Sequence, residues 1–272
     1  MKTQAEKSEI FRALHQRERA FIIPNPWDVG NARLLAGLGF EALATTSAGY
    51  AFSIGRRDGR VSRDETLAHA KAIVSASDLP VSADLENGFG DSPEEARETI
   101  RLAAEVGLAG GSIEDVPTHG GTVYELEHAA ERVRAAAEMA HSLPVRFTLT
   151  ARAENYLVGR PDLADTIRRL QAFQEAGADV LYAPGLSTKE DIAAVVRSVD
   201  RPVNVIMGLQ GVQLSLEELS ALGVKRISVG SALSRAALGA FLRAAREMKE
   251  RGTFMFAEQA VSFREISSMF PE

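Results

Sequence analysis

The sequence predicts a single (β/α)8 barrel, an α/β fold in which parallel strands alternate with helices around a closed sheet. Short apolar segments alternate with longer segments that carry apolar residues at helical spacing. Alternation of this kind produces a parallel sheet, and eight such units suit a closed barrel. No G-x-G-x-x-G motif follows the first expected strand, which disfavours an open dinucleotide-binding sheet.

Eight segments are expected as strands, because each is short, apolar or β-branched, and bounded by turn residues. In chain order they are residues 21–24, 42–45, 81–84, 111–114, 146–151, 180–183, 203–207 and 226–229. Helices are expected where good helix formers carry an apolar face, at residues 64–77, 92–106, 126–141, 164–176, 189–198 and 216–222. Glycines in residues 36–39, 106–108, 176–178 and 222–224 are typical of helix ends that precede a buried strand.

Two segments lie outside this repeat, although residues 1–272 are expected to form one domain. A leading helix at 4–16 suits a cap over the amino-terminal end of the barrel. A tail over 253–272 follows the last barrel helix and carries Phe254, Met255, Phe256, Phe263 and Met269. Such an apolar tail needs a covering surface, which can be a second subunit or the chain's own barrel.

Composition excludes several classes of function. The net charge of −6 offers no basic surface for nucleic acid or an anionic membrane. The absence of cysteine excludes disulfides, thiolate metal sites and a cysteine nucleophile. The first twenty residues are charged throughout, unlike a signal peptide, and no apolar run reaches the ~20 residues of a membrane span. A cytoplasmic enzyme is therefore expected.

Acidic side chains gather where expected strands end, which is where barrel enzymes place their chemistry. Asp84 and Glu86 are two residues apart, so an extended backbone points both side chains the same way. Glu114 ends the next strand at the same height. Converging carboxylates repel one another unless a cation joins them, and an all-oxygen set suits Mg²⁺ or Mn²⁺. For any one of these carboxylates, helix capping or pairing with arginine is the alternative.

Other strand ends supply groups that can bind a small acid. Arg152 can hold a carboxylate in a bidentate fork, although a salt bridge to Glu154 or Glu114 fits it equally well. A stretch of small residues after the second strand offers hydroxyl and amide groups for an oxyanion, or simply a tight turn. The candidate substrate-binding residues are Trp27, Thr46, Ser47, Ala48, Arg152 and Asn204.

The lysines argue against one mechanism. All six lie outside the carboxyl ends of the expected strands, whereas a Schiff-base aldolase needs a lysine in the barrel mouth. Stabilisation of an enolate by a metal ion is the expected route instead. Residues 228–233 resemble a phosphate-binding turn, although an ordinary helix start fits them better.

Six short motifs, in this order and within residues 21–242, resemble those of the isocitrate lyase/phosphoenolpyruvate mutase superfamily. They are Asn25-Pro-Trp-Asp28, Thr45-Thr-Ser-Ala-Gly49, Gly55-Arg-Arg-Asp58, Ser82-Ala-Asp-Leu-Glu-Asn-Gly-Phe-Gly90, Gly111-Ser-Ile-Glu-Asp115 and Thr150-Ala-Arg-Ala-Glu154. Each motif alone has modest specificity, but the ordered set is highly specific.

The resemblance implies a metal-dependent barrel that binds 2-oxo acids and makes or breaks a C–C or P–C bond beside the carbonyl. Asp84 looks like the direct Mg²⁺ ligand, and Asp58, Glu86 and Glu114 resemble the acids that hold the metal's waters. Arg152, the Thr46–Ala48 turn and Asn204 resemble the substrate-binding residues. The resemblance also implies a homo-oligomer, a dimer or a tetramer built from pairs of dimers that exchange a C-terminal helix.

One departure from the family concerns the lid after the fourth strand. Lyases of the superfamily carry a Lys-Lys-Cys-Gly-His motif there, whereas residues 116–124 contain neither cysteine nor lysine. His119 or Tyr124 is the candidate proton donor in its place. The expected function is a Mg²⁺-dependent lyase that cleaves a C–C bond of a small 2-oxo acid or 2-hydroxy polycarboxylate through an enolate. The alternatives are oxaloacetate decarboxylation, phosphonopyruvate-type P–C chemistry and non-catalytic binding of a 2-oxo acid.

Overall fold

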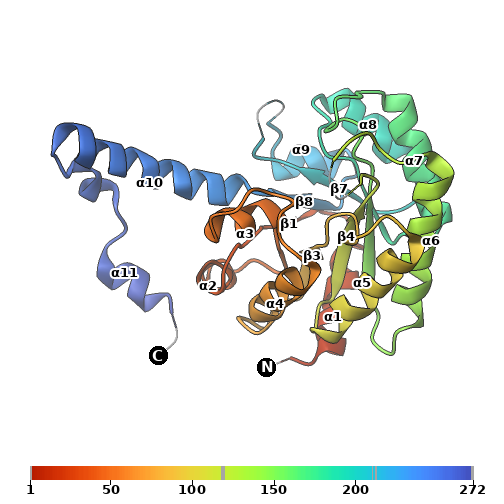
Figure 1. Cartoon of the computed structure of the whole chain (residues 1–272), viewed down its shortest axis with the longest axis horizontal. Helices are drawn as coiled ribbons and strands as arrows, with labels where there is room; N and C mark the ends of the chain where they lie inside the picture. Colours follow the sequence, from red (N-terminus) through yellow and green to blue (C-terminus); the bar gives the residue numbers. More distant parts are fainter. Residues whose placement is uncertain (1, 118–119, 210, 212, 271–272) are drawn as a thin grey trace.

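The computed structural model describes residues 2–117, 120–209, 211 and 213–270, and its strands form one parallel sheet rolled into a barrel (Figure 1). The order around the sheet is β1-β8-β7-β6-β5-β4-β3-β2. At the seam between β1 and β2, the amide of Ala44 donates to the carbonyl of Pro24 at 3.1 Å. The strands are β1 (Phe21–Ile23), β2 (Leu43–Ala44), β3 (Val81–Asp84), β4 (Gly110–Glu114), β5 (Thr148–Arg152), β6 (Val180–Tyr182), β7 (Val203–Ile206) and β8 (Arg226–Ser228). The predicted barrel and its eight strands are confirmed.

Helices surround this sheet, and several begin with the reciprocal hydrogen bonds of a capping box. In the box at Ser92, the hydroxyl accepts from the amide of Glu95 while the Glu95 side chain accepts from the amide of Ser92. The helices are α1 (Gln4–Leu14), α2 (Val29–Gly37), α3 (Ser47–Ser53), α4 (Arg63–Val74), α5 (Pro93–Glu105), α6 (Leu126–Ser142), α7 (Leu163–Glu175), α8 (Lys189–Arg197), α9 (Leu216–Ala221), α10 (Ala232–Arg251), the 3₁₀ helix η1 (Met255–Gln259) and α11 (Phe263–Ser268).

The helix α3 differs from the expectation of a turn after the second strand. Thr46 is its N-cap, and the Thr46 hydroxyl accepts a hydrogen bond from the amide of Gly49 at 3.3 Å. Position 49 lies inside this helix and is a glycine, because a side chain there would collide with Thr46 and Trp27. The small residues that suggested a turn therefore allow close packing of a short helix.

Apolar side chains pack between the strands and the helices, and polar ones point into the barrel. On β8, for example, Ile227 belongs to the main apolar core, while Arg226 and Ser228 line the internal cavity. The inward residues of β3, β4 and β7 include Ser82, Ser112 and Asn204. Barrel interiors are usually filled by branched aliphatic side chains. The small polar side chains here leave room inside the barrel.

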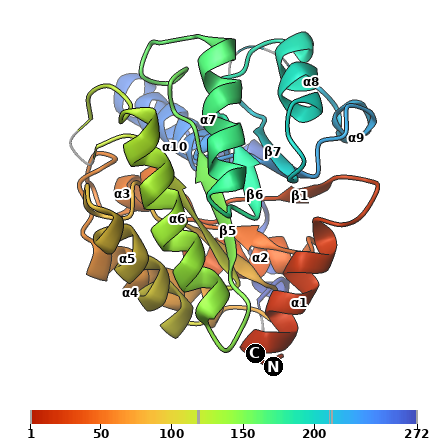
Figure 2. The same ribbon diagram turned by 90° about the vertical axis from the view of Figure 1, so that its right-hand side faces the viewer.

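The helix α1 closes the amino-terminal end of the barrel, as predicted (Figure 2). Its Phe11 and Leu14 are fully buried against Phe21 and Ile23 of β1. The ring of His15 meets that of Phe21 edge-on, with centroids 5.0 Å apart.

The helix α10 extends away from the barrel as an arm and carries η1 and α11 at its far end (Figure 1). Phe241 on this arm is 67% exposed, and Phe263 on α11 is 87% exposed. Large apolar side chains thus remain uncovered on the described chain. Among the described residues, no helix combines the length and the apolar character needed to cross a bilayer.

Candidate active site

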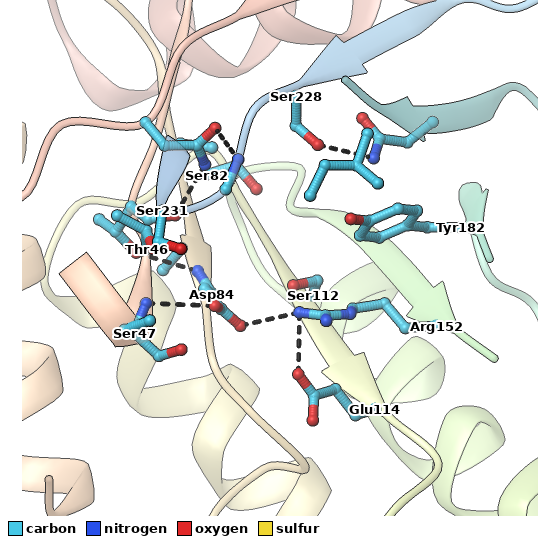
Figure 3. A pocket seen from close by; sticks show the side chains of 18 of the residues that line it. Thr46, Ser47, Ser82, Asp84, Ser112, Glu114, Arg152, Tyr182, Ser228 and Ser231 are labelled. Carbon is cyan, nitrogen blue, oxygen red and sulfur yellow. Dashed lines mark hydrogen bonds and ion pairs between the residues drawn. The ribbon is translucent and has the colours of Figure 1, made fainter. Parts of the chain in front are cut away.

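A cavity of about 300 Å³ opens at the carboxyl ends of the strands and continues into the barrel (Figure 3). A second hollow of about 340 Å³ adjoins it and is lined by Glu86. Ser47, Asp58 and Glu114 border both spaces. The predicted site residues on the wall of the first cavity are Thr46, Ser47, Ala48, Asp58, Asp84, Glu114, Arg152 and Asn204.

Arg152, at the end of β5, occupies the centre of the site and contacts three carboxylates. Its Nη1 lies 3.1 Å from Asp84 Oδ1 and 2.9 Å from Glu114 Oε1, and its Nε lies 2.7 Å from Glu154 Oε1. Burial lowers the pKa of Arg152, but these carboxylates outweigh burial and hold it well above its usual range. The sequence left open whether Arg152 binds a substrate carboxylate or forms salt bridges to Glu154 or Glu114. The structure contains both of these salt bridges.

Asp84 is held in place by groups from neighbouring segments. Its backbone amide donates to Thr45 Oγ1 at 3.0 Å. Its Oδ2 accepts from the amide of Ser47 in the first turn of α3 at 3.2 Å, and Oδ1 lies 3.4 Å from the amide of Glu86. Figure 3 shows Asp84 between Ser47 and Arg152. These contacts fix the orientation of the Asp84 carboxylate.

The acids around Asp84 carry more negative charge than Arg152 alone can balance. Burial, followed by the charges of Asp84 and Asp58, raises the pKa of Glu86 to about 7. Partial removal from water, together with the charge of Asp84, raises the pKa of Asp58. Burial and the neighbouring carboxylates raise the pKa of Glu114 well above its usual range, although Arg152 opposes them.

Glu86 stands out in this group for two reasons. Its Oε1 is buried and accepts no hydrogen bond from any residue that the structure describes. Its backbone has a φ of +49°, in the left-handed region that non-glycine residues seldom adopt. Strain of this kind collects at binding sites, where the surrounding structure maintains it.

Two buried arginines support the loops that carry the acids. Arg132 of α6 donates to the carbonyl oxygens of Glu114 at 3.0 Å and Gly90 at 2.8 Å, and also to that of Asn87. Arg169 of α7 pairs with Asp115 at 3.1 Å. Asp115 in turn accepts from the amide of Glu154 at 2.8 Å, which connects the segments after β4 and β5.

Two predicted residues, Trp27 and Tyr124, lie elsewhere. His119 falls outside the described residues. Trp27 packs beside α3, near Gly49, and does not belong to the cavity wall. The hydroxyl of Tyr124 donates to Asp91 at 2.6 Å, and burial, followed by the hydrogen bond to Asp91, raises the Tyr124 pKa to about 12. Tyr124 lines neither space, so its position does not support a role as proton donor.

Sequence reasoning missed several residues of the cavity wall, among them Asn25 and Arg226. Asn25 donates to the carbonyl of Thr45 and accepts from the amides of Val229 and Gly230. Those amides are therefore occupied, which fits the ordinary helix start expected there rather than a phosphate-binding turn. Arg226, the first residue of β8, lines the part of the cavity nearer the amino-terminal ends of the strands. Its sequence signal was a charged residue at an inward position of a strand.

The chain is similar to a known protein family, to solved structures and to other protein sequences. The family model described as phosphoenolpyruvate phosphomutase matches residues 11–249. A crystal structure of a lyase/mutase from Burkholderia cenocepacia is 61% identical, covers 99% of this chain and 97% of its own, and has a TM-score of 0.95. An uncharacterised protein of Mycobacterium tuberculosis is 32% identical over 88% of this chain and 89% of its own length.

Relatives with named activities are also present. A 2-methylisocitrate lyase of Halalkalibacterium halodurans is 30% identical over 74% of this chain and 68% of its own length. An oxaloacetate decarboxylase of Pseudomonas aeruginosa is 28% identical over 91% of this chain and 86% of its own length.

Proposed function

The chain belongs to the phosphoenolpyruvate mutase/isocitrate lyase superfamily, and from this premise we propose that it is a Mg²⁺-dependent carbon–carbon lyase acting on a small 2-oxo acid. The observation that carries the proposal is the cluster of Asp84, Glu114 and Arg152 at the mouth of an internal cavity. It places a candidate metal ligand and a carboxylate-binding cation within one hydrogen-bonded group.

The donor set fits Mg²⁺ bound through water. No three acidic or histidine side chains in the described part of the chain can ligate one ion directly. Mg²⁺ commonly binds through one or two carboxylates and keeps several waters, so Asp84 would be its direct ligand. Asp58, Glu86 and Glu114 would hold the waters, and the unpartnered Glu86 Oε1 supports this arrangement. When bound, the ion would stabilise negative charge that develops on the 2-oxo oxygen.

Arg152 would bind the substrate carboxylate. Its shortest contacts with acidic side chains use Nε and Nη1, and Nη2 donates no hydrogen bond to a residue of the described chain. Thr46 and Ala48 border the same cavity, and the Thr46 hydroxyl and the Ala48 amide would orient a second oxygen.

The reaction breaks the bond between C3 and C4 of the 2-oxo acid. C4 leaves as CO₂ or, where it carries a hydroxyl group, as a carbonyl compound whose hydroxyl proton passes to a carboxylate of the site. The bonding electron pair moves toward the 2-oxo group, and C3 then takes up a proton. We propose His119 as the donor of that proton. Decarboxylation develops charge in the same place, so an oxaloacetate-like substrate is the second candidate, supported by the relative from Pseudomonas aeruginosa.

Incubation with a panel of 2-oxo acids and 2-hydroxy polycarboxylates in Mg²⁺ tests this proposal. Formation of pyruvate without CO₂ would identify retro-aldol cleavage, and formation of pyruvate together with CO₂ would identify decarboxylation. We expect Asp84→Ala to lower turnover at least about 100-fold, as expected for loss of a group that stabilises the developing charge. Asp200→Ala, which removes an exposed carboxylate outside the cavity, is the matched control.

Two outcomes would reject the proposed activity. Full turnover in EDTA or in Asp84→Ala would remove the metal from the reaction. Binding of 2-oxo acids without turnover of any of them would instead favour a non-catalytic binding protein.

We also propose that the arm formed by α10, η1 and α11 makes a subunit contact. Its support is the exposed apolar surface that includes Phe241 and Phe263. Phe241→Glu should reduce the mass of the assembly in light scattering, while Arg246→Glu on the same helix should leave it unchanged. An unchanged mass for Phe241→Glu would argue against this contact.

A further inference from the structure

Arg226 lies on the cavity wall nearer the amino-terminal end of the barrel than Arg152. It begins β8, and its guanidinium reaches across to β5 and β7. Nη2 donates to Thr150 Oγ1 at 3.0 Å, and Nε donates to Asn204 Oδ1 at 2.8 Å. Thr150 precedes Arg152 by two residues on β5, which corresponds to about 7 Å along a strand.

The guanidinium of Arg226 is buried, and none of the residues that the structure describes is its counter-ion. Arg226 is 5% exposed, and its Nη1 has no hydrogen-bond partner in the described part of the chain. No acidic side chain of the described residues forms an ion pair with it, and its two bonded oxygens are neutral. Charged groups are seldom buried in proteins unless an opposite charge or a ligand accompanies them.

The charge of Arg226 persists at neutral pH. Burial lowers its pKa to about 10, so the guanidinium stays protonated. His15 cannot balance it, because an imidazole ring is either neutral or positive. Burial, followed by the charge of Arg226, lowers the His15 pKa to about 3 and keeps that ring neutral.

The buried arginines Arg169 and Arg132 differ from Arg226 in their contacts. Arg169 pairs with Asp115 and Asp165 at 3.1 and 2.9 Å. Arg132 donates to three carbonyl oxygens and has acidic groups nearby. Of these three arginines, Arg226 is the one that lines the cavity and has no counter-ion among the described residues.

We infer that Arg226, with Asn204 and Ser228 on the same cavity wall, forms a subsite for a second carboxylate of the substrate, at the end distant from the 2-oxo group. The unused Nη1 and the hydroxyl of Ser228 supply donors for a carboxylate, and Thr150 holds the guanidinium in place. The inference rests on the proposed function, because it assumes that the 2-oxo end binds beside Asp84 and Arg152. It adds a residue that selects dicarboxylates over monocarboxylates of the same length.

Binding to the Mg²⁺-loaded protein tests the subsite with two matched pairs of acids. 2-Oxoglutarate is compared with 2-oxovalerate, and oxaloacetate with 2-oxobutyrate, by isothermal titration calorimetry. A charge-assisted bond to Arg226 should make each dicarboxylate bind about 10- to 100-fold tighter than its partner. In Arg226→Met the ratio should fall to about one, with monocarboxylate affinity changed by less than about twofold.

Two further variants keep the result interpretable. Arg226→Lys retains a cation and should retain part of the preference, even if Arg226→Met folds poorly. Arg146→Met removes an arginine that does not line this cavity and should leave the ratio unchanged. Equal binding of both acids by the wild-type protein, or an equal loss of both in Arg226→Met, would overturn the subsite.

The ratio remains measurable if the proposed lyase activity fails. Absence of turnover, or insensitivity of binding to Mg²⁺, would contradict the proposed function alone. A preference for dicarboxylates that depends on Arg226 would still support the subsite in that case.

Discussion

Arg152 and Arg226 lie inside the same barrel but in opposite electrostatic surroundings. Arg152 contacts three carboxylates at 2.7 to 3.1 Å, whereas Arg226 contacts a hydroxyl and an amide oxygen and has one nitrogen unpartnered among the described residues. Arg152 therefore supplies charge that the folded acids require. Arg226 adds a charge that the fold itself does not balance, which makes it the better indicator of an anionic ligand.

The largest effect is expected from Arg152→Met. This change leaves Asp84, Glu114 and Glu154 close together without their cation, and breaking a buried pair in this way costs about 3–5 kcal/mol. Urea unfolding of the metal-free protein measures the loss. Mg²⁺ should restore part of the stability if it binds the same acids.

The contrast between the two arginines predicts a smaller effect for Arg226→Met in the same unfolding experiment. Arg146→Met, which removes an arginine with a half-exposed side chain, controls for loss of a surface charge. If Arg152→Met proved as stable as the wild-type protein without Mg²⁺, Arg152 would not be the counter-ion that the acids require.

The surroundings of Arg152 could be predicted from the sequence. Chain order alone places the ends of β3, β4 and β5 side by side, since consecutive strands of a barrel are neighbours. Asp84, Glu114 and Arg152 stand at those ends, so their proximity follows from the alternation of strands and helices.

The surroundings of Arg226 could not be predicted in the same way. Its partners Thr150 and Asn204 come from β5 and β7, and their contact depends on strand register and barrel stagger, which hydrophobic periodicity does not specify. The helix α3 was missed because Ser47, Ala48 and Gly49 together give only a weak helix signal, and packing against Trp27 favours the helix instead.

An effect of intermediate size on the pH dependence of folding stability is expected from His15, whose ring is close to the charge of Arg226. Burial and the charge of Arg226 lower its pKa to about 3 in the folded protein, against about 6.5 in an unfolded chain. The folded state therefore binds this proton more weakly. The stability from neutral His15 is complete above pH 6.5 and is lost as pH falls toward 3, by about 2 kcal/mol at pH 5.

Urea unfolding at pH 7 and pH 5 compares the wild-type protein with His15→Gln, which cannot take up a proton. The other titrating groups are common to both proteins, so the difference isolates His15. Arg226→Met should weaken the pH dependence, because it removes the neighbouring positive charge. Identical pH dependence in the wild-type protein and His15→Gln would show that His15 is not held neutral.

The smallest effect is expected from Asn204→Asp, which gives Arg226 the counter-ion that Arg152 already has. The side chains have the same shape, and Ser228 Oγ, which now accepts from Asn204 Nδ2 at 3.1 Å, can donate instead. An internal carboxylate should add about 1 kcal/mol of stability. It should also abolish the preference for dicarboxylates, because the substrate would then compete with the introduced carboxylate for Arg226 and be repelled by it.

A double-mutant cycle with Arg226→Met separates charge pairing from any other consequence of Asn204→Asp. In the double variant the introduced carboxylate is buried without a cation, so stability should fall below that of Arg226→Met. A coupling free energy near zero would mean that the two side chains do not interact through charge. Retention of the dicarboxylate preference of about 10- to 100-fold in Asn204→Asp would mean that Arg226 can bind a substrate carboxylate while it is paired with an acid. Arg226 would then resemble Arg152.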